Sequence, residues 1–228
     1  MTSFVEIFPA VVALVLELYL VFLLLRGPFR KYPLFFLYAI GQVLGDSLEA
    51  YAYYHFGHDS RFYRTSYWTN EGTSALLLFL VVISFTYEAL RGNPLLSKAG
   101  KILGAVAALT LASPFVLFHS RIFSYRWFNS TDQMLNFGCA LMNLVLWGAL
   151  LSNRRRDSQL LTISMGVGIV ATSAGVVWGA RLWVSDNNRW PLDTFGVLMK
   201  VAALLLWCWL FRPKTTRSAP PQAATMLS

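Results

Sequence analysis

Residues 192–211 have the sequence LDTFGVLMKVAALLLWCWLF, a run of twenty residues with only two charged side chains, Asp193 and Lys200. A helix needs about 20 mostly apolar residues to cross the hydrocarbon core of a bilayer. Six other segments of the chain meet the same standard. They are residues 4–25, 34–54, 68–90, 102–119, 133–151 and 160–183.

The composition also indicates membrane insertion. Of 228 residues, 56% are hydrophobic and 13% are charged, whereas soluble domains carry about 25% charged residues. This excludes an ordinary soluble domain, and the apolar content excludes a disordered chain. The net charge of +8 lies in short clusters between apolar segments, so it does not indicate nucleic-acid binding. We predict an all-α polytopic protein in a lipid bilayer, with seven transmembrane helices over residues 1–212 and a disordered cytoplasmic tail over residues 213–228.

The basic residues are unequally divided between the two sides of this predicted bundle. The poorer side has Arg61, Arg64, Arg121, Arg126, Arg181 and Arg189. The richer side has Arg26, Arg30, Lys31, Arg91, Lys98, Lys101, Arg154, Arg155, Arg156, Arg212, Lys214 and Arg217. By the positive-inside rule the richer side is cytoplasmic, which puts the N-terminus outside and the C-terminus inside. The first segment has no basic residues before it, so we predict a retained span rather than a cleaved signal.

Polar residues recur at helical spacing inside the second and fifth apolar segments. Residues at i, i+4, i+7 and i+11 share one helix face, and polar groups at membrane depth usually face the bundle interior or water. The acidic residues also gather toward the predicted outer side. We therefore predict a polar pocket that opens to the outside. The two rows are Gln42, Asp46, Glu49 and Tyr53, and Asp132, Asn136, Cys139 and Asn143.

Depth along the helices links the second and seventh segments. At ~1.5 Å per residue, Asp46 and Lys200 both lie about 12 Å from the outer ends of their segments. Because a carboxylate stabilises an ammonium group at such depth, we expect Lys200 to pair with Asp46 or Glu49. Glu17 and Asn143 are expected in the inner half instead. The candidate pocket residues are Asp46, Glu49, Glu71, Asp132, Asn136, Asp193 and Lys200.

Patterns that indicate catalysis or metal binding are weak. The sequence has no GxSxG, HExxH or Walker-type motif, so no catalytic residue is assigned. The histidines are His55, His58 and His119, all toward the predicted outer side. Zinc needs three or four converging ligands, and the spacing of these histidines does not require them to converge. We expect histidines in surface loops and no metal site.

The sixth segment has small residues at helical spacing. Such residues let helix backbones approach closely and favour association in lipid. Close packing within the bundle is the simplest interpretation, and docking of a partner protein through this helix is the alternative. The row consists of Ser164, Gly168, Thr172, Gly175 and Gly179.

Seven spans, an outer N-terminus and Lys200 in the seventh span give a topological resemblance to the retinal-binding rhodopsins. The resemblance implies a retinal Schiff base on Lys200 with a carboxylate counter-ion. The chain departs from the microbial pattern at Gly196, where those proteins have Asp, and at Tyr67, which precedes Trp68 in place of their counter-ion. A lysine in an ion pair explains the same residue, so the cofactor stays open. The counter-ion candidates are Asp46, Glu71 and Asp193.

Short motifs spread over most of the chain give a second resemblance. They are Tyr67-Trp68 followed by Glu71, then Tyr87-Glu88, the basic loop of residues 91–101, and Lys200 with Trp207. In these motifs the chain is similar to a group of small seven-span bacterial membrane proteins of the acidobacterial type. The resemblance implies the topology described above and a bacterial inner-membrane location. It implies no activity.

Two classes of function fit a polar pocket on the outer side. A sensor would bind a small molecule, ion or lipid there and signal through a separate protein. A transport or channel component would need polar rows through the inner half as well, where polar residues are few. A structural assembly subunit and a divergent retinal-binding protein are further alternatives. Of these, we expect a small-ligand or ion sensor.

Overall fold

Seven α-helices make up nearly all of the structure. The computed structural model describes residues 4–90, 96–117, 125–152, 158–181, 183–184 and 190–213, and these residues contain no β-strand. The predicted tail lies outside the described residues except for Pro213. The elements are α1 (Phe4–Leu25), the short 3-10 helix η1 (Pro28–Arg30), α2 (Pro33–Phe56), α3 (Arg61–Leu90), α4 (Leu96–Leu117), α5 (Tyr125–Ser152), α6 (Ser158–Arg181) and α7 (Trp190–Phe211).

The helices coincide with the apolar segments of the sequence, and three of them begin six or more residues earlier than predicted. α3 begins at Arg61, α4 at Leu96 and α5 at Tyr125, whereas their apolar segments begin at residues 68, 102 and 133. Ser60 explains the start of α3, because its Oγ accepts a hydrogen bond from the backbone N–H of Tyr63 at 3.0 Å. A serine in this N-cap position satisfies one of the free donors of the first helical turn. Polar residues can therefore extend the helix beyond the apolar segment.

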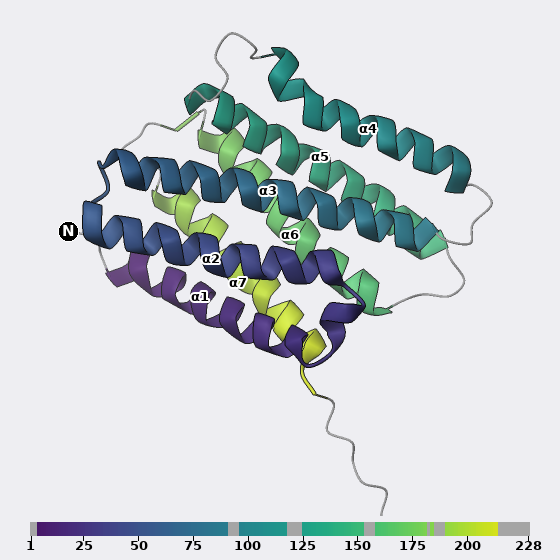
Figure 1. The fold of residues 1–228 in the computed structure, drawn as a ribbon, viewed down its shortest axis with the longest axis horizontal. Helices are drawn as coiled ribbons and strands as arrows, with labels where there is room; N and C mark the ends of the chain where they lie inside the picture. Colours follow the sequence, from purple (N-terminus) through teal and green to yellow (C-terminus); the bar gives the residue numbers. More distant parts are fainter. Residues whose placement is uncertain are drawn as a thin grey trace, which may run out of the picture.

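Consecutive helices run in opposite directions (Figure 1). α1 contacts α2 and α7, α3 contacts α2 and α5, and α6 contacts α5 and α7. α4 packs mainly on α5, at the edge of the bundle. The start of α1 and the end of α7 lie at opposite ends of the bundle (Figure 1). We call the end with the start of α1 and the turn between α2 and α3 the outer end, after the orientation predicted from the sequence.

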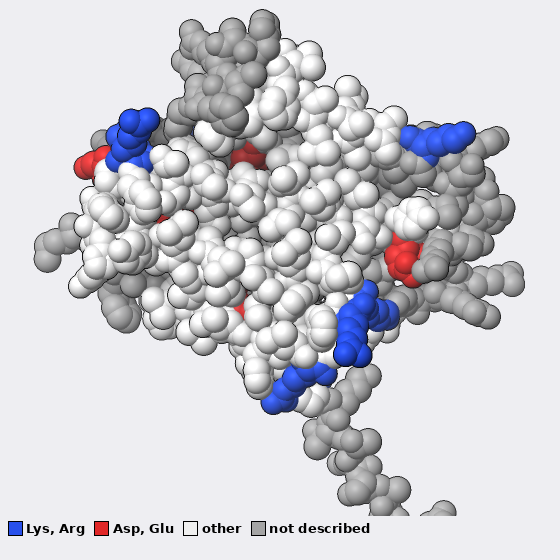
Figure 2. All heavy atoms as spheres, viewed as in Figure 1, with Lys and Arg blue, Asp and Glu red and all other residues white. Residues whose placement is uncertain are grey.

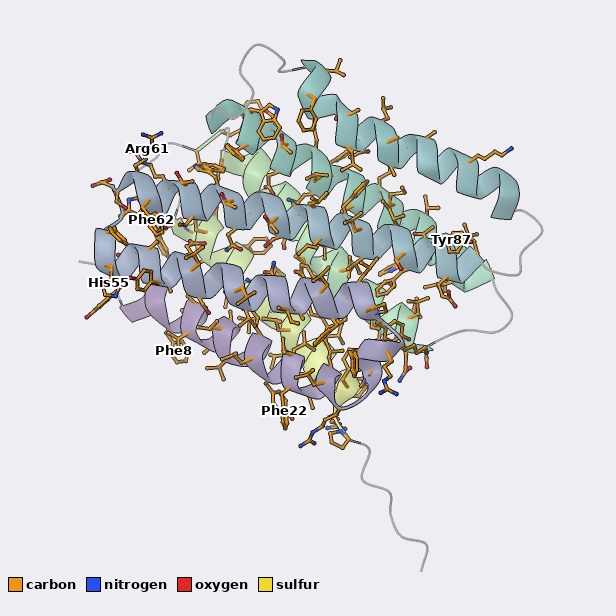
Figure 3. All side chains as sticks on the ribbon, viewed as in Figure 1. Phe8, Phe22, His55, Arg61, Phe62 and Tyr87 are labelled. Carbon is orange, nitrogen blue, oxygen red and sulfur yellow. The ribbon has the colours of Figure 1, made fainter. Side chains whose placement is uncertain are left out.

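The outside of the bundle is apolar between its two ends. α1 exposes Phe8, Val15 and Phe22, and Phe8 and Phe22 point away from the bundle in Figure 3. Figure 2 shows Lys and Arg side chains at the ends of this face and, between them, a broad surface that is uncharged except for a few recessed acidic atoms. Among the described residues, four helices are long and apolar enough to cross a membrane, namely α1, α3, α6 and α7. Such a surface suits a bilayer, while the seven-span topology and its orientation stay predictions.

An aromatic cluster fills the bundle on the inner side of Lys200. Trp207 is 1% exposed, and its ring meets that of Phe35 edge-on with 5.0 Å between centroids. The Trp207 Nε1 donates a hydrogen bond to the backbone oxygen of Ile163 at 3.1 Å. A Cβ atom added at Gly166 would overlap the Trp207 indole, so glycine lets α6 approach α7 here. The cluster of Phe35, Tyr38, Phe85, Trp207 and Phe211 closes the interior at this level.

The small residues of α6 are used in part for packing within the bundle. The Ser164 backbone oxygen accepts a hydrogen bond from Asn143 Nδ2 at 3.2 Å, and its Oγ accepts one from Trp147 Nε1 at 3.0 Å. Gly168 lies against the Asn143 amide. A Cβ atom at Gly175 would instead meet no described neighbour within 4 Å. The inner half of the row therefore packs on α5, and its outer half is uncovered within the described residues.

Candidate functional site

Lys200 joins three helices near the middle of the bundle. Its Nζ lies 2.8 Å from Oδ2 of Asp46 on α2 and 2.7 Å from Oε1 of Glu17 on α1. The pairing of Lys200 with Asp46 expected from their depths is therefore confirmed. Glu49 joins this group through its hydrogen bond with Asn70. We call Lys200, Glu17, Asp46, Glu49 and Asn70 the Lys200 cluster.

Asn70 of α3 connects the two carboxylates of α2. Its Nδ2 donates hydrogen bonds to Oδ1 of Asp46 at 3.0 Å and to Oε2 of Glu49 at 3.1 Å. Its Oδ1 in turn accepts a longer hydrogen bond of 3.4 Å from Ser74 Oγ. A Cβ atom at Gly45 would overlap the Asn70 amide, so the absence of a side chain at this position lets Asn70 lie against α2. One amide group thus bridges two acidic side chains one helical turn apart.

Glu17 is the member of the cluster that the sequence analysis misplaced. It was expected in the inner half, but the structure puts it beside Lys200 at the level of Asp46. Depth counted separately along each helix does not include the stagger between α1 and α7, which explains the error. Glu17 is 1% exposed, and its Oε2 has no hydrogen-bond partner among the described residues.

A small cavity adjoins Glu17 and Lys200. It has a volume of about 10 Å³ and is also lined by Tyr38, Gln42 and Trp207. This is space for roughly one water molecule, and the lining has the polar groups that a buried water needs. A ligand of retinal's size occupies roughly 300 Å³ or more. Retinal on Lys200 would therefore require the aromatic cluster around Trp207 to rearrange.

Asp193 lies nearer the outer end and pairs with a different cation. Its Oδ1 accepts hydrogen bonds from Arg181 of α6, from Nη2 at 2.5 Å and from Nε at 3.2 Å. Arg181 also forms a hydrogen bond with Tyr67 of α3. Beside this pair, a hollow of about 310 Å³ lies between α1 and α7, lined by Pro9, Trp190, Asp193, Thr194 and Val197. Asp193 thus borders a hollow at the outer end and does not contact the Lys200 cluster.

Asp132 and Asn136 form a second polar group, on α5. The Asn136 Nδ2 donates hydrogen bonds of 3.0 Å to both Oδ1 and the backbone oxygen of Asp132. Asp132 is 1% exposed and Asn136 is 5% exposed. Glu71 of α3 interacts electrostatically with Asp132 and also with Glu49. Glu71 therefore links this group to the Lys200 cluster.

Carboxyl groups outnumber basic groups in this part of the bundle. Among the described residues, five carboxyl groups lie here besides Asp193, and the cations that act on them are Lys200 and Arg181. An unpaired charge in such surroundings is unfavourable and is usually neutralised or matched by a cation. The five carboxyl groups belong to Glu17, Asp46, Glu49, Glu71 and Asp132.

The sequence analysis did not select Asn70, Arg181 or Glu17 as pocket residues. A row of Ser66, Asn70 and Ser74 at i, i+4 and i+8 on α3 is the pattern that could have identified Asn70. Arg181 was counted only as an outer basic residue, and its pairing depends on α6 and α7 being neighbours. The helical spacing of polar residues in the sequence does not show which helices are neighbours.

The histidines lie at the surface where the structure describes them. His55 packs its ring against Tyr51 with 4.4 Å between centroids, and it lies at the outer end of the bundle in Figure 3. His58 Nδ1 is 3.6 Å from Asp59, and both side chains are exposed. His119 lies outside the described residues. Within the described ranges, no group of three or more His, Cys, Asp and Glu side chains could hold a metal ion.

No protein-family model matches the chain, and neither a curated protein nor a solved structure is significantly similar to it.

Proposed function

We propose that the chain is a seven-span inner-membrane protein that senses a small cation. The cation would reach the Lys200 cluster from the outer side, and its binding would be passed on through a partner protein. The observation that carries the proposal is the double pairing of Lys200, whose ammonium group contacts acidic residues of two other helices. The Lys200 ammonium group holds α7 to α1 and α2. A ligand that binds Glu17 or Asp46 would therefore change the packing of these three helices.

The charges favour a positively charged ligand over an anion. Lys200 matches only part of the acidic charge around it, and Glu49 receives hydrogen bonds from the neutral side chains of Asn70 and Tyr63. A small cation beside Asp46 and Glu49 would be matched by these two carboxylates and would keep water as its other ligands, because Asn70 directs its NH₂ group at both carboxylates. An anion would meet several carboxyl groups and a single ammonium group.

The position of the cluster supports sensing. α1, α2 and α7 meet at Lys200, and Asn70 adds α3. A cation that competes with Lys200 for Asp46 would favour an arrangement with a weaker contact between α2 and α7. A ligand shifts such an equilibrium by its difference in affinity for the two arrangements. The small-residue row of α6 is uncovered at Thr172 and Gly175, and a partner helix that docks there would respond to the change in packing.

Thermal unfolding of the purified protein tests the proposal. Sodium, potassium and ethylammonium chloride are compared at constant ionic strength, with N-methylglucamine chloride as the bulky reference. We expect a saturable rise in Tm with at least one small cation in the wild type, and its loss in Asp46→Asn. Asp59→Asn, an exposed change outside the cluster, serves as the control and keeps the rise. The same Tm with every cation would overturn the proposal.

The aromatic cluster around Trp207 favours sensing over transport. It fills the bundle on the inner side of Lys200, and the cavity beside Lys200 has a volume of only about 10 Å³. Cation flux into liposomes that contain the protein would assign transport instead. A visible absorption band after addition of retinal, lost in Lys200→Ala, would assign a retinal-binding protein.

A further inference from the structure

Asp132 is a buried acidic residue on α5 that the cation site does not include. It is 1% exposed, and only one of its carboxyl oxygens, Oδ1, accepts a hydrogen bond, from Asn136. Its Oδ2 has no hydrogen-bond partner among the described residues. A charged carboxylate in this position would leave a buried oxygen without a donor, which is strongly unfavourable.

The groups that face Asp132 from neighbouring helices do not balance a negative charge. The strongest charged neighbour is Glu71 of α3, which is itself acidic, and the next is Arg181 of α6. Arg181 already binds Asp193 and Tyr67. α4, which packs on the other side of α5, contributes no charged group that acts on Asp132 among the described residues. On α5 itself the partner is the neutral amide of Asn136.

The surroundings suit a proton better than a metal ion. A hard cation such as Ca²⁺ takes 6–8 oxygen ligands, and Mg²⁺ requires six. The described neighbours offer the carboxyl groups of Asp132 and Glu71, while Asn136 directs its NH₂ group at Asp132. A proton needs only one carboxyl oxygen to bind.

We propose that Asp132 is a proton-binding site on α5, outside the Lys200 cluster. One proton from solution binds Oδ2 of Asp132 and converts the carboxylate into a neutral carboxylic acid. The proton neutralises a buried oxygen that has no donor among the described residues, and Oδ1 keeps its hydrogen bond from Asn136. Release of the proton returns it to solution and leaves a buried negative charge on α5. Binding therefore favours the packing of α5 in the bundle, and release weakens it.

Infrared spectroscopy of the purified protein detects such a proton directly. A neutral carboxyl group gives a carbonyl stretching band that shifts in D₂O. We expect this band in the wild type at neutral pH and its loss in Asp132→Asn, with Asp59→Asn as a control that keeps it. No carboxyl band in the folded wild type at any pH, or a band unchanged in Asp132→Asn, would overturn the site. A band that responds to sodium but not to pH would overturn it in favour of a metal cation.

The stability of the variant gives a second, independent measurement. Asparagine is neutral and has the shape of protonated aspartic acid, so Asp132→Asn should fold with a Tm close to that of the wild type. Because the folded state holds a proton that the unfolded state releases, the wild-type free energy of unfolding should fall as the pH rises. This fall should be reduced in Asp132→Asn. If that variant does not fold, Glu71→Gln, which removes the acidic neighbour of Asp132, should lower the pH at which the carbonyl band disappears, and an unchanged pH would overturn the proposal.

Discussion

Lys200 and Asp46 are separated by 154 positions in the chain, and their side chains form an ion pair of 2.8 Å. Glu17 lies on the same ammonium group at 2.7 Å and is almost fully buried. A buried carboxylate that loses its cation is left unmatched, which costs much more than the loss of an exposed ion pair. This relationship makes the energetics of the site testable by substitution.

Lys200→Met should lower the free energy of unfolding by about 3 kcal/mol, because it breaks a buried ion pair. This value is at the low end of the range for such pairs, because the Lys200 side chain is partly exposed. Adding Glu17→Gln to Lys200→Met should recover part of the loss, because the second change removes the unmatched carboxylate. Lys101→Met, at an exposed position on α4, serves as the control. Denaturant titration in detergent gives the free energy of unfolding of the wild type, the single variant, the double variant and the control. Equal stability of Lys200→Met and the control would contradict the pairing.

Asn70→Ala should lower the free energy of unfolding by about 2 kcal/mol, because it removes the donor shared by Asp46 and Glu49. Thr69→Ala changes an exposed neighbour on the same helix and should have little effect. The prediction fails if both variants unfold at the same denaturant concentration.

Gly45→Ala and Gly72→Ala should have opposite effects. Alanine is favoured over glycine inside a helix by up to about 1 kcal/mol, so Gly72→Ala, with no described neighbour within 4 Å, should be neutral or stabilising. Gly45→Ala should be destabilising by about 1–2 kcal/mol, since the new methyl group displaces Asn70. Thermal unfolding of the two variants checks this contrast. A stabilising Gly45→Ala would show that Asn70 does not lie against α2.

Reporter fusions test the predicted orientation. Alkaline phosphatase, which is active only outside the inner membrane, should be active when fused after residue 58, in the turn between α2 and α3. It should be inactive when fused after residue 155, in the basic segment before α6. The reverse pattern would invert the topology, and activity at both sites would exclude seven spans.

The helices and one contact of the site could be predicted from the sequence. Long apolar segments identified seven helices, because length and hydrophobicity are local properties of the chain. Lys200 and Asp46 could be identified as partners because they lie at about the same distance from the outer ends of their helices. These inferences needed no knowledge of which helices touch.

Glu17 and Asn70 depend on tertiary packing instead. Glu17 reaches Lys200 only because α1 lies beside α7 with a stagger that counting along one helix does not include. Asn70 reaches α2 because Gly45 leaves space for its amide, a close approach between two helices that periodicity does not reveal. Asp193 was a candidate for the same pocket as Lys200, but Arg181 of the neighbouring α6 binds it nearer the outer end.

Titration calorimetry tests directly whether a small cation binds at the Lys200 cluster. The purified protein is titrated with sodium chloride and then with ethylammonium chloride, against N-methylglucamine chloride at the same ionic strength. A cation site at the Lys200 cluster predicts saturable heat with at least one small cation in the wild type and only dilution heat in Asp46→Asn. Dilution heat alone in the wild type, or saturable heat that persists in Asp46→Asn, would contradict it.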